Sequence, residues 1–423
     1  MTKDITARAK NWNPPPRPEW MKRINEEGSY LDIKSVVPLD ENSLLKAAKE
    51  NTGHSDFGVE DWYQPFKVLI KALDQEAEMT LMGRIMARSD IILYLQARLQ
   101  VEDTYKRHPE IDDEQITKPI LIVGQGRSGT SALMNLLSYD PENGVCKTWE
   151  AYFPCPPPEK ATYLTDPRSA RADKLITQWN RVVPEMPSVH EFTGEIPTES
   201  IQLLCLAFQS PSWFTMTSPV NSYVEFVTKI GMLPAFRYKK RVMKLLQWKN
   251  PRQHWVLKSP DATRHMLEAL EVFPDITLVW PHRDPVKAMS SAVNTLGLLA
   301  WTRTDWPLRP GTFEMVTDAS ACGAMLSGPI NLIESNPKLR AQLCNVQYQD
   351  FLDKPLAVVE QIYATCGRKV SKAGRAAMQK YMDEYPRSSR PPAVYALGEK
   401  ELIANERTFF KRYQDYFGVP NEI

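Results

Sequence analysis

The stretch 123–131 reads VGQGRSGTS and follows KPILI, an apolar run that we expect to form a buried strand. A phosphate-binding loop with the pattern G-x-x-x-x-G-K-[ST] requires two glycines, then a lysine and a hydroxyl residue. Both glycines and the final hydroxyl are in register here, but Thr130 occupies the lysine position and the positive charge lies at Arg127. The stretch therefore predicts a strand–loop–helix unit that binds an anion without the usual lysine.

The glycines of this loop explain how an anion would be held. Gly124, Gly126 and Gly129 allow successive backbone N–H groups to point into one concavity, and the helix that follows adds its N-terminal amides. Arg127 adds a permanent charge and a planar fork that suits phosphate or sulfate oxygens. Three side-chain hydroxyls add further donors: Ser128, Thr130 and Ser131.

Strands and helices alternate from this loop to the C-terminus. Four short apolar runs predict strands: 118–124, 254–258, 276–280 and 343–348. A helical pattern follows each run: 131–140, 261–273, 285–296 and 355–367. This alternation predicts the α/β class, with a P-loop-like parallel sheet flanked by helices and ligands at the carboxyl ends of its strands.

The chain before the loop has a different pattern. Residues 1–117 predict a mostly helical region that packs on the core, with helices over 40–53 and two more within 62–107. The proline-rich segment 1–38 predicts an extended arm. A stripe of apolar residues at helical spacing is typical of core packing: Met79, Met82, Ile85, Met86, Ile92, Leu95 and Leu99.

The remainder, 118–423, predicts one α/β domain. Residues 151–250 interrupt its alternation with FPCPPPEK and long helical and aromatic stretches. We interpret this segment as a helical insertion on the substrate side. Two parts of it, 206–216 and 223–236, are apolar and aromatic enough to line a pocket for a lipophilic molecule, or to serve as core.

Composition excludes several classes of protein. The 423 residues carry 52 Lys+Arg against 51 Asp+Glu, so no overall field recruits nucleic acid or an anionic membrane. No signal-peptide pattern and no apolar run of membrane-spanning length occurs. The six histidines include no H-E-x-x-H pair, so we expect no metal site. The six cysteines have no C-x-x-C spacing, which predicts free thiols in a reducing cytoplasm.

The missing lysine bears on the chemistry of the loop. Nucleotide kinases use that lysine, with Mg²⁺ held by a hydroxyl and an acidic residue. Here the third predicted strand is followed by Pro281-His282-Arg283, a basic end where an acidic residue would hold the metal. The bound group is therefore expected to be held by protein cations, and a sulfuryl group carries less negative charge than a terminal phosphoryl group.

Three segments resemble, in order, the sulfotransferases that use 3′-phosphoadenosine 5′-phosphosulfate (PAPS). They are VGQGRSGTSALMNLLSYDP, WVLKSPDATRHMLEALEVFPDITLVWPHRDPVKAMSSAVNTL and VQYQDFLDKPLAVVEQIYATCG. The resemblance covers roughly residues 118–416 and is strongest to the bacterial branch with R-S-G-T in the loop, which also resembles tyrosylprotein sulfotransferases. The first two segments are the specific ones.

The resemblance implies a donor site. The loop from Gly126 to Ser131 would bind the 5′-phosphosulfate of PAPS and, after transfer, adenosine 3′,5′-bisphosphate. Arg283 at the end of the third strand and Ser291, two turns into the next helix, would bind the 3′-phosphate. Tyr348 would line the adenine pocket, or be a buried structural tyrosine.

A basic C-terminal segment closes over the 3′-phosphate in the family. Here the loosely matching RSSRPPAVYALGEKEL supplies Arg387 and Arg390, which are equally compatible with an ordinary solvated loop.

The catalytic residues are only partly implied by the resemblance. Lys258 aligns with a family lysine that stabilises charge on the bridging oxygen. The cytosolic branch reads K-T-H, with the histidine as base, but this chain reads Lys258-Ser259-Pro260, and proline accepts no proton. The base is predicted to be Glu150, at about the spacing of the tyrosylprotein-branch glutamate, or His190 with its carboxylate neighbours, or Glu199.

These observations predict a cytoplasmic, PAPS-dependent sulfotransferase that acts on a hydroxyl or phenol of a small, lipophilic acceptor by in-line displacement. Two alternatives remain open. A nucleotide-dependent phosphotransferase with an aberrant loop predicts binding of ATP with Mg²⁺. A non-catalytic module predicts binding of adenosine 3′,5′-bisphosphate without turnover.

Overall fold

A computed structural model describes residues 6–190, 192–386 and 396–423. Its centre is a five-stranded sheet in the order β2-β3-β1-β4-β5, and every pair is parallel. The strands are β1 (Ile120–Ile122), β2 (Asn143–Gly144), β3 (His254–Lys258), β4 (Thr277–His282) and β5 (Leu343–Gln347). The predicted α/β fold with a parallel sheet is thus confirmed. The two-residue edge strand β2 was not predicted, because it is too short to show a pattern.

The strand β1 is apolar on both faces, and helices cover both. Ile120 and Ile122 pack in one cluster with Leu133, whereas Leu121 and Val123 belong to the other. The smaller cluster lies under α7 (Thr130–Ser138), α21 (Pro355–Thr365) and α22 (Lys372–Glu384). The larger cluster continues into the N-terminal helices and residues 151–250. Alternate residues of one short strand therefore hold two layers together.

The helices predicted in the N-terminal region are present, and α4 (Glu41–Thr52) has the predicted ends. In this helix, the Asp40 carboxylate accepts the N–H of Ser43 at 2.9 Å, and Gly53 ends the helix with φ 72°. The helices expected within 62–107 are α5 (Tyr63–Gln75) and α6 (Leu81–Arg107). The apolar stripe is buried as expected except Ile92, which is half-buried, and Ile85, which is 41 % exposed.

The prediction of a wholly extended arm over 1–38 is wrong. This segment contains α1 (Ala7–Lys10), α2 (Glu19–Ser29) and α3 (Ile33–Val36). Four of its five prolines lie between α1 and α2, and the fifth, Pro38, follows α3, so none of them interrupts a helix. Two long-range contacts hold the arm on α16 (Pro285–Trp301): the indole of Trp12 covers Gly297, and Arg8 donates to Ser290 Oγ at 2.6 Å.

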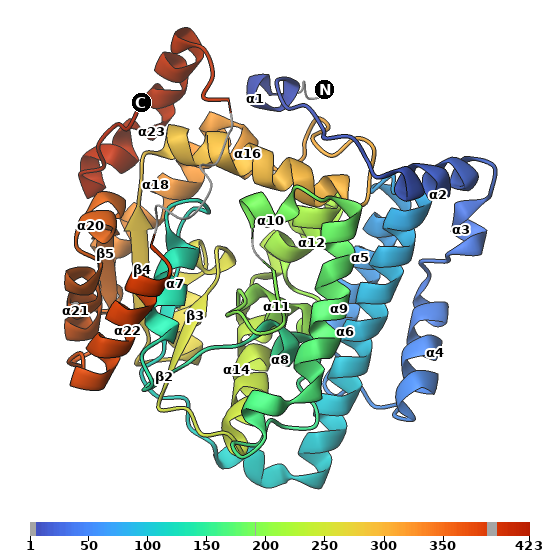
Figure 1. The fold of residues 1–423 in the computed structure, drawn as a ribbon, viewed down its shortest axis with the longest axis horizontal. Helices are drawn as coiled ribbons and strands as arrows, with labels where there is room; N and C mark the ends of the chain where they lie inside the picture. Colours follow the sequence, from blue (N-terminus) through green and yellow to red (C-terminus); the bar gives the residue numbers. More distant parts are fainter. Residues whose placement is uncertain (1–5, 191, 387–395) are drawn as a thin grey trace.

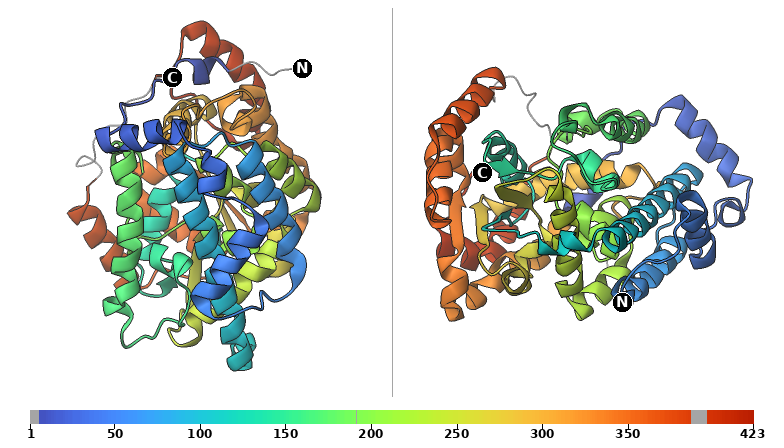
Figure 2. Two further views of the ribbon diagram at one scale, coloured as in Figure 1. Left: turned by 90° about the vertical axis from the view of Figure 1, so that its right-hand side faces the viewer. Right: turned by 90° about the horizontal axis from the view of Figure 1, so that it is seen from below.

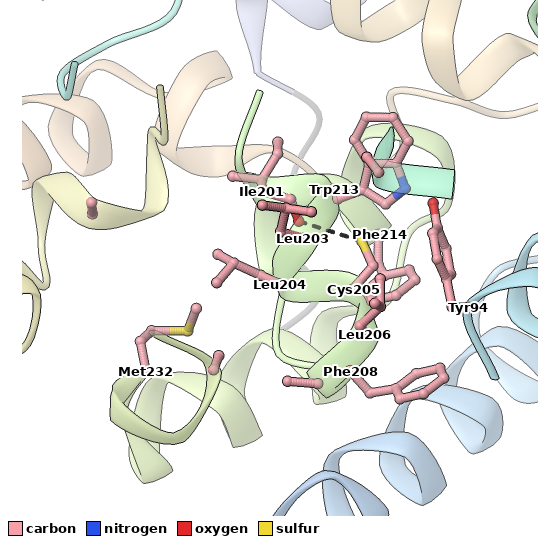
Figure 3. Close-up of a cluster of buried hydrophobic side chains, with 14 of the residues drawn as sticks. Tyr94, Ile201, Leu203, Leu204, Cys205, Leu206, Phe208, Trp213, Phe214 and Met232 are labelled. Carbon is pink, nitrogen blue, oxygen red and sulfur yellow. Dashed lines mark hydrogen bonds between the residues drawn. The ribbon is translucent and has the colours of Figure 1, made fainter. Parts of the chain in front are cut away.

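The longer elements of residues 151–250 are all α-helices. They include α9 (Pro167–Val182), α11 (Ile201–Leu204), α12 (Pro211–Thr217), α13 (Asn221–Ile230) and α14 (Leu233–Trp248). Figure 3 shows how α11 and α12 bring apolar side chains together, among them Ile201, Leu203 and Phe214. The division into an N-terminal region, 1–117, and an α/β domain, 118–423, stays a proposal, since one hydrophobic cluster runs through both.

The C-terminal helices complete the molecule beside the sheet. α18 (Ala319–Ser335) packs along α23 (Lys400–Phe417), and α16 crosses above β4 in Figure 1. In the right-hand view of Figure 2, the N-terminal helices lie on the side opposite α21 and α22. The single helix expected over 261–273 is instead a 3₁₀ turn, Asp261–Thr263, followed by α15 (Met266–Val272).

Two further expectations concern thiols and membranes. All six cysteines are free, as predicted. Within the described ranges, no helix combines the length and the apolar character needed to cross a bilayer.

Candidate active site

A cavity of about 1780 Å³ opens beside the carboxyl ends of β1, β3 and β4. The phosphate-loop residues form one wall, and Lys258 and Arg283 from the ends of β3 and β4 also line it. Sites for single small molecules span roughly 300–1,000 Å³. The cavity therefore has room for two ligands at once, as a group-transfer reaction requires.

The loop has the conformation that its glycines predict. Gly124 has φ 103° and Gly129 has φ 86°, and an added Cβ would meet Trp280 at 2.6 Å or Tyr348 at 2.9 Å. A Cβ at Gly126 would meet nothing within 4 Å, so the space beside it belongs to the cavity. Gly129 is also the N-cap of α7 and has no side chain to accept from the first amides. These amides are therefore available for an anion.

Three side chains join the loop to β4 and α16. Arg127, with φ 69°, donates through Nε to Ser291 Oγ at 2.9 Å and through Nη1 to the carbonyl of Val189 at 3.1 Å. Arg283 donates to the carbonyl of Arg127 at 2.8 Å, and its guanidinium lies 4.2 Å from the centre of the Tyr348 ring. The structure thus brings the four predicted donor-site residues Arg127, Arg283, Ser291 and Tyr348 together, although Ser291 contacts Arg127 and is not among the residues lining the cavity.

Lys258 connects this loop to a carboxylate of the insertion. Its Nζ donates to Ser131 Oγ at 2.8 Å and forms an ion pair with Glu199. The Lys258 side chain is 8 % exposed and that of Glu199 is 18 % exposed. Ser200 holds the adjacent backbone, because its N–H and hydroxyl both bind the carbonyl of Lys258, at 2.8 and 2.9 Å. Both charges therefore face the cavity at a defined place beside the loop.

The opposite half of the cavity is largely apolar. Its walls come from α12, α13, α16, α17 (Glu314–Thr317) and α18. The apolar side chains that line it include Trp213, Met216, Val224, Leu296, Leu299, Phe313, Met315 and Met325. Of the two segments proposed for this role, 206–216 is divided: Leu206 and Phe208 belong to the core, and only the part from Pro211 onward reaches the cavity.

The comparison with known families decides the class of the protein. The sulfotransferase-family model matches residues 119–372, which is more than half of the chain. The chain belongs to the sulfotransferase family. Sulfotransferase STF1 from Mycobacterium tuberculosis H37Rv is similar over 89% of this chain and 98% of its own, with 25% identity and a TM-score of 0.73.

A second solved structure supports the fold alone. Sulfotransferase STF9 from Mycobacterium avium is 24% identical, with a TM-score of 0.76 over 90% of this chain and 97% of its own. A search of curated protein sequences finds no match.

Among the loop residues of this sulfotransferase, two hydroxyls have different surroundings. Thr130 and Ser131 line the cavity. Ser128 is buried, and its hydroxyl donates to the carbonyl of Gln125 at 2.6 Å. The side chain of Ser128 therefore stabilises the turn, and only its backbone is left to contact the anion.

Glu150, the preferred base in the sequence analysis, is not among the described residues that line the cavity. Its side chain is fully buried in an ion pair with Arg252, and its other oxygen accepts the N–H of Lys147 at 2.9 Å. These contacts fix the start of α8 (Thr148–Tyr152) and engage both carboxylate oxygens of Glu150. Glu199, by contrast, lines the cavity.

The other predicted residues have mixed outcomes. His190 lines the cavity and stacks on Phe192, with ring centres 4.1 Å apart, and the carbonyl of the preceding Val189 accepts from Arg127. Its neighbour Glu191, and the predicted phosphate ligands Arg387 and Arg390, lie outside the described residues.

Sequence reasoning missed a polar group at the turn after β3. The Asp261 carboxylate accepts from Ser212 and lines the cavity, while its Oδ2 has no hydrogen-bond partner among the described residues. Burial raises the pKa of this carboxyl. In the same turn, Thr263 Oγ1 accepts the N–H of Gly124 at 2.7 Å. Only the tertiary structure reveals these roles, because Asp, Ser and Thr in a loop are ordinary.

Proposed function

We propose that this sulfotransferase transfers the sulfuryl group of PAPS to a hydroxyl or phenol of a lipophilic acceptor. One observation carries the proposal: Lys258 joins the anion-binding loop to a carboxylate, Glu199, where a basic half of the cavity meets an apolar half. A transfer from an anionic nucleotide to a lipophilic alcohol requires this combination of surfaces.

The basic half fits a nucleotide with phosphate and sulfate groups. Arg127, Lys258 and Arg283 supply three cations on its wall, and the first amides of α7 have no side-chain cap. The open space beside Gly126 allows a ligand to approach the backbone closely. Bound there, PAPS would supply the sulfuryl group that is transferred.

Two side chains then have defined tasks. Glu199 would accept the proton of the acceptor hydroxyl on a carboxylate oxygen, since this side chain lines the cavity beside the loop. Lys258 would donate from Nζ to the bridging oxygen on which negative charge increases during transfer. Ser131, which already accepts from Lys258, orients that ammonium group.

The apolar half supports a lipophilic acceptor. Side chains such as Trp213, Met216 and Leu299 would remove water from the hydrophobic part of the molecule, while its hydroxyl approaches Glu199. His190 stays a second candidate for the base because it also faces this cavity.

The test is a thermal-shift titration with adenosine 3′,5′-bisphosphate without metal, and separately with ATP and Mg²⁺. Wild type, Arg127→Ala and Arg283→Ala would be compared. At about a hundred times its Kd, a ligand stabilises the folded state by roughly 2.7 kcal/mol. We expect the bisphosphate to stabilise wild type and to lose most of its effect in both variants. Stabilisation by ATP with Mg²⁺ alone would instead support a phosphotransferase.

Turnover separates an enzyme from a binding module. Transfer of radiolabelled sulfate from PAPS to a panel of phenols and sterols would be measured. Binding of the bisphosphate without transfer to any of them would contradict the catalytic part of the proposal.

A further inference from the structure

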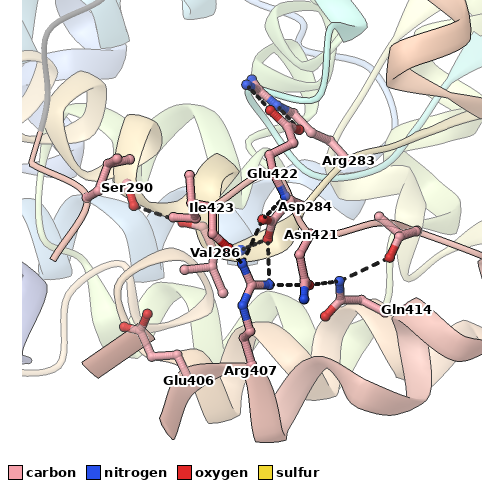
Figure 4. A network of polar contacts seen from close by, with 12 residues as sticks. Arg283, Asp284, Val286, Ser290, Glu406, Arg407, Gln414, Asn421, Glu422 and Ile423 are labelled. Atoms are coloured by element: carbon pink, nitrogen blue, oxygen red, sulfur yellow. Dashed lines mark hydrogen bonds and ion pairs between the residues drawn. The ribbon is translucent and has the colours of Figure 1, made fainter. Parts of the chain in front are cut away.

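The last six residues, 418–423, return from α23 to the donor end of the cavity. Gly418, with φ 64°, reverses the chain, and the backbone N–H of Glu422 donates to Asp284 Oδ2 at 2.7 Å. Arg407 of α23 pairs with the same carboxylate at 3.0 Å and also binds the carbonyl of Ile423. Figure 4 shows this network beside Arg283. The tail is therefore held at a specific place by contacts with Asp284, the N-cap of α16, and with Arg407 of α23.

This placement puts an acidic side chain on Arg283. The two carboxylate oxygens of Glu422 accept from Nε and Nη2 of Arg283 at 2.8 and 3.0 Å. The Arg283 side chain is 12 % exposed and that of Glu422 is 27 % exposed, so solvent only partly screens the pair. A bidentate contact of this kind uses the same two N–H groups with which an arginine holds a phosphate.

A second edge of the guanidinium is also engaged, because Nη1 donates to the carbonyl of Arg127. One face of the group lies against Tyr348. With these contacts in place, Nε and Nη2 form the fork that a phosphate would use, and Glu422 holds it.

We propose that Glu422 competes with the 3′-phosphate of the donor nucleotide for Arg283, so that the tail 418–423 releases this arginine when the nucleotide binds. The inference rests on the proposed function, in which Arg283 binds that phosphate. It adds an internal carboxylate that weakens donor binding and speeds release of the nucleotide product. A nucleotide without a 3′-phosphate has no need to displace Glu422.

The test measures binding by calorimetry on the full chain, with adenosine 3′,5′-bisphosphate and with adenosine 5′-phosphate. Wild type, Glu422→Gln and Glu422→Ala are compared with Asp415→Asn. This control removes one negative charge from an exposed side chain of α23 that pairs with Lys411 and not with Arg283. We expect both Glu422 variants to bind the bisphosphate about five to ten times more tightly, with no change for the 5′-phosphate or for the control.

A double-mutant cycle shows whether the effect passes through Arg283. In an Arg283→Gln background, the Glu422→Gln change should no longer increase affinity for the bisphosphate. Hydrogen exchange gives a readout independent of affinity: bisphosphate should speed exchange at residues 419–423 while it slows exchange in the loop 124–131.

The opposite results identify other roles. Unchanged or weaker bisphosphate binding by the Glu422 variants would overturn the competition and make Glu422 a positioning residue for Arg283. Slower exchange in the tail on binding would mean that the tail closes over the nucleotide, which also contradicts the inference. If neither wild type nor any variant binds the bisphosphate, the donor assignment fails together with the inference.

Discussion

The basic half of the cavity, which we propose binds the donor, and the apolar half, which we propose binds the acceptor, are built in different ways; they are called the donor half and the acceptor half below. The donor half comes mainly from one continuous stretch, 124–131, and from residues that directly end strands, such as Lys258 and Arg283. The acceptor half comes from short segments of five helices between α12 and α18. One side of the cavity is therefore determined by backbone conformation and strand order, and the other by packing between distant helices.

This difference matters for what each half recognises. In the proposed reaction, backbone amides and strand-end cations would bind the charged groups of the donor. An apolar wall assembled from many helices changes shape with each side chain, so it would set which acceptor fits. Lys258 and Glu199 lie at the boundary, and changes there should affect chemistry more than binding.

Glu199→Gln should give the largest effect. A glutamine cannot accept the acceptor proton, so we expect kcat to fall by about 10²–10⁴, with less than a threefold change in the Kd of adenosine 3′,5′-bisphosphate. Steady-state kinetics with the best phenol or sterol acceptor and calorimetry would measure the two quantities. Glu195→Gln is the control, since its side chain is about half exposed and pairs with Lys147. Full activity in Glu199→Gln would transfer the role to His190.

Glu150→Gln should act on stability instead of catalysis. The change leaves Arg252, whose side chain is 5 % exposed, without its charged partner. Loss of one member of a buried pair costs about 3–5 kcal/mol, so we expect a lower free energy of unfolding in denaturant titrations. Activity of the remaining folded enzyme at low temperature should stay near that of wild type. A large loss of kcat with unchanged stability would restore Glu150 as the base.

Acid should lower the free energy of unfolding through His282, which lies beside Arg283 at the end of β4. His282 at the end of β4 is buried, contacts Tyr413 Oη and Asn345 Oδ1 at 2.8 and 2.9 Å, and has its pKa lowered by burial to about 4. A lowered pKa means that the unfolded chain binds the proton more tightly. The contribution of neutral His282 to the free energy of unfolding is thus complete above about pH 6.5. It is lost as pH falls toward 4, by about 3 kcal/mol.

Unfolding in urea between pH 4 and 7 would measure this slope. His282→Gln should flatten it within that window, whereas His108→Gln, at a surface histidine, should not. An unchanged slope in His282→Gln would show that other groups cause the acid sensitivity.

Met216→Ala should have the smallest effect and should be confined to the acceptor half. The side chain lines the cavity from α12, so its loss removes apolar contact with the acceptor. For a bulky acceptor we expect a fall in kcat/KM equivalent to about 1–2 kcal/mol of transition-state stabilisation, mostly through KM, with no change in bisphosphate affinity. Met134→Ala is the comparison variant, because Met134 lines the cavity from α7, beside the loop, and not from the apolar half. Equal losses for large and small acceptors would argue against a size-selective wall.

Much of the fold could be predicted because its signals are local. The Asp40 cap and the Gly53 stop delimit α4, and the apolar run that contains Ile120–Ile122 precedes a glycine loop with a helix behind it. The strand β2 was not predicted, since two residues are too few to show a periodic pattern. The helices α1 to α3 were not predicted, because the prolines of segment 1–38 favoured an extended chain. These elements are stabilised by partners far away in the sequence, such as Arg8 with Glu406.

The conformation of the glycine loop 124–131 follows from local sequence. Positive φ angles at Gly124 and Gly129, and cations at the ends of parallel strands, follow from residues that are neighbours in the chain. The different surroundings of Glu150 and Glu199 become visible only in the folded chain, because both follow the loop and both carry the same chemical group. Packing buries the first against Arg252 and presents the second to Lys258. A side chain's task depends on the charges that folding brings beside it, and these come from other parts of the chain.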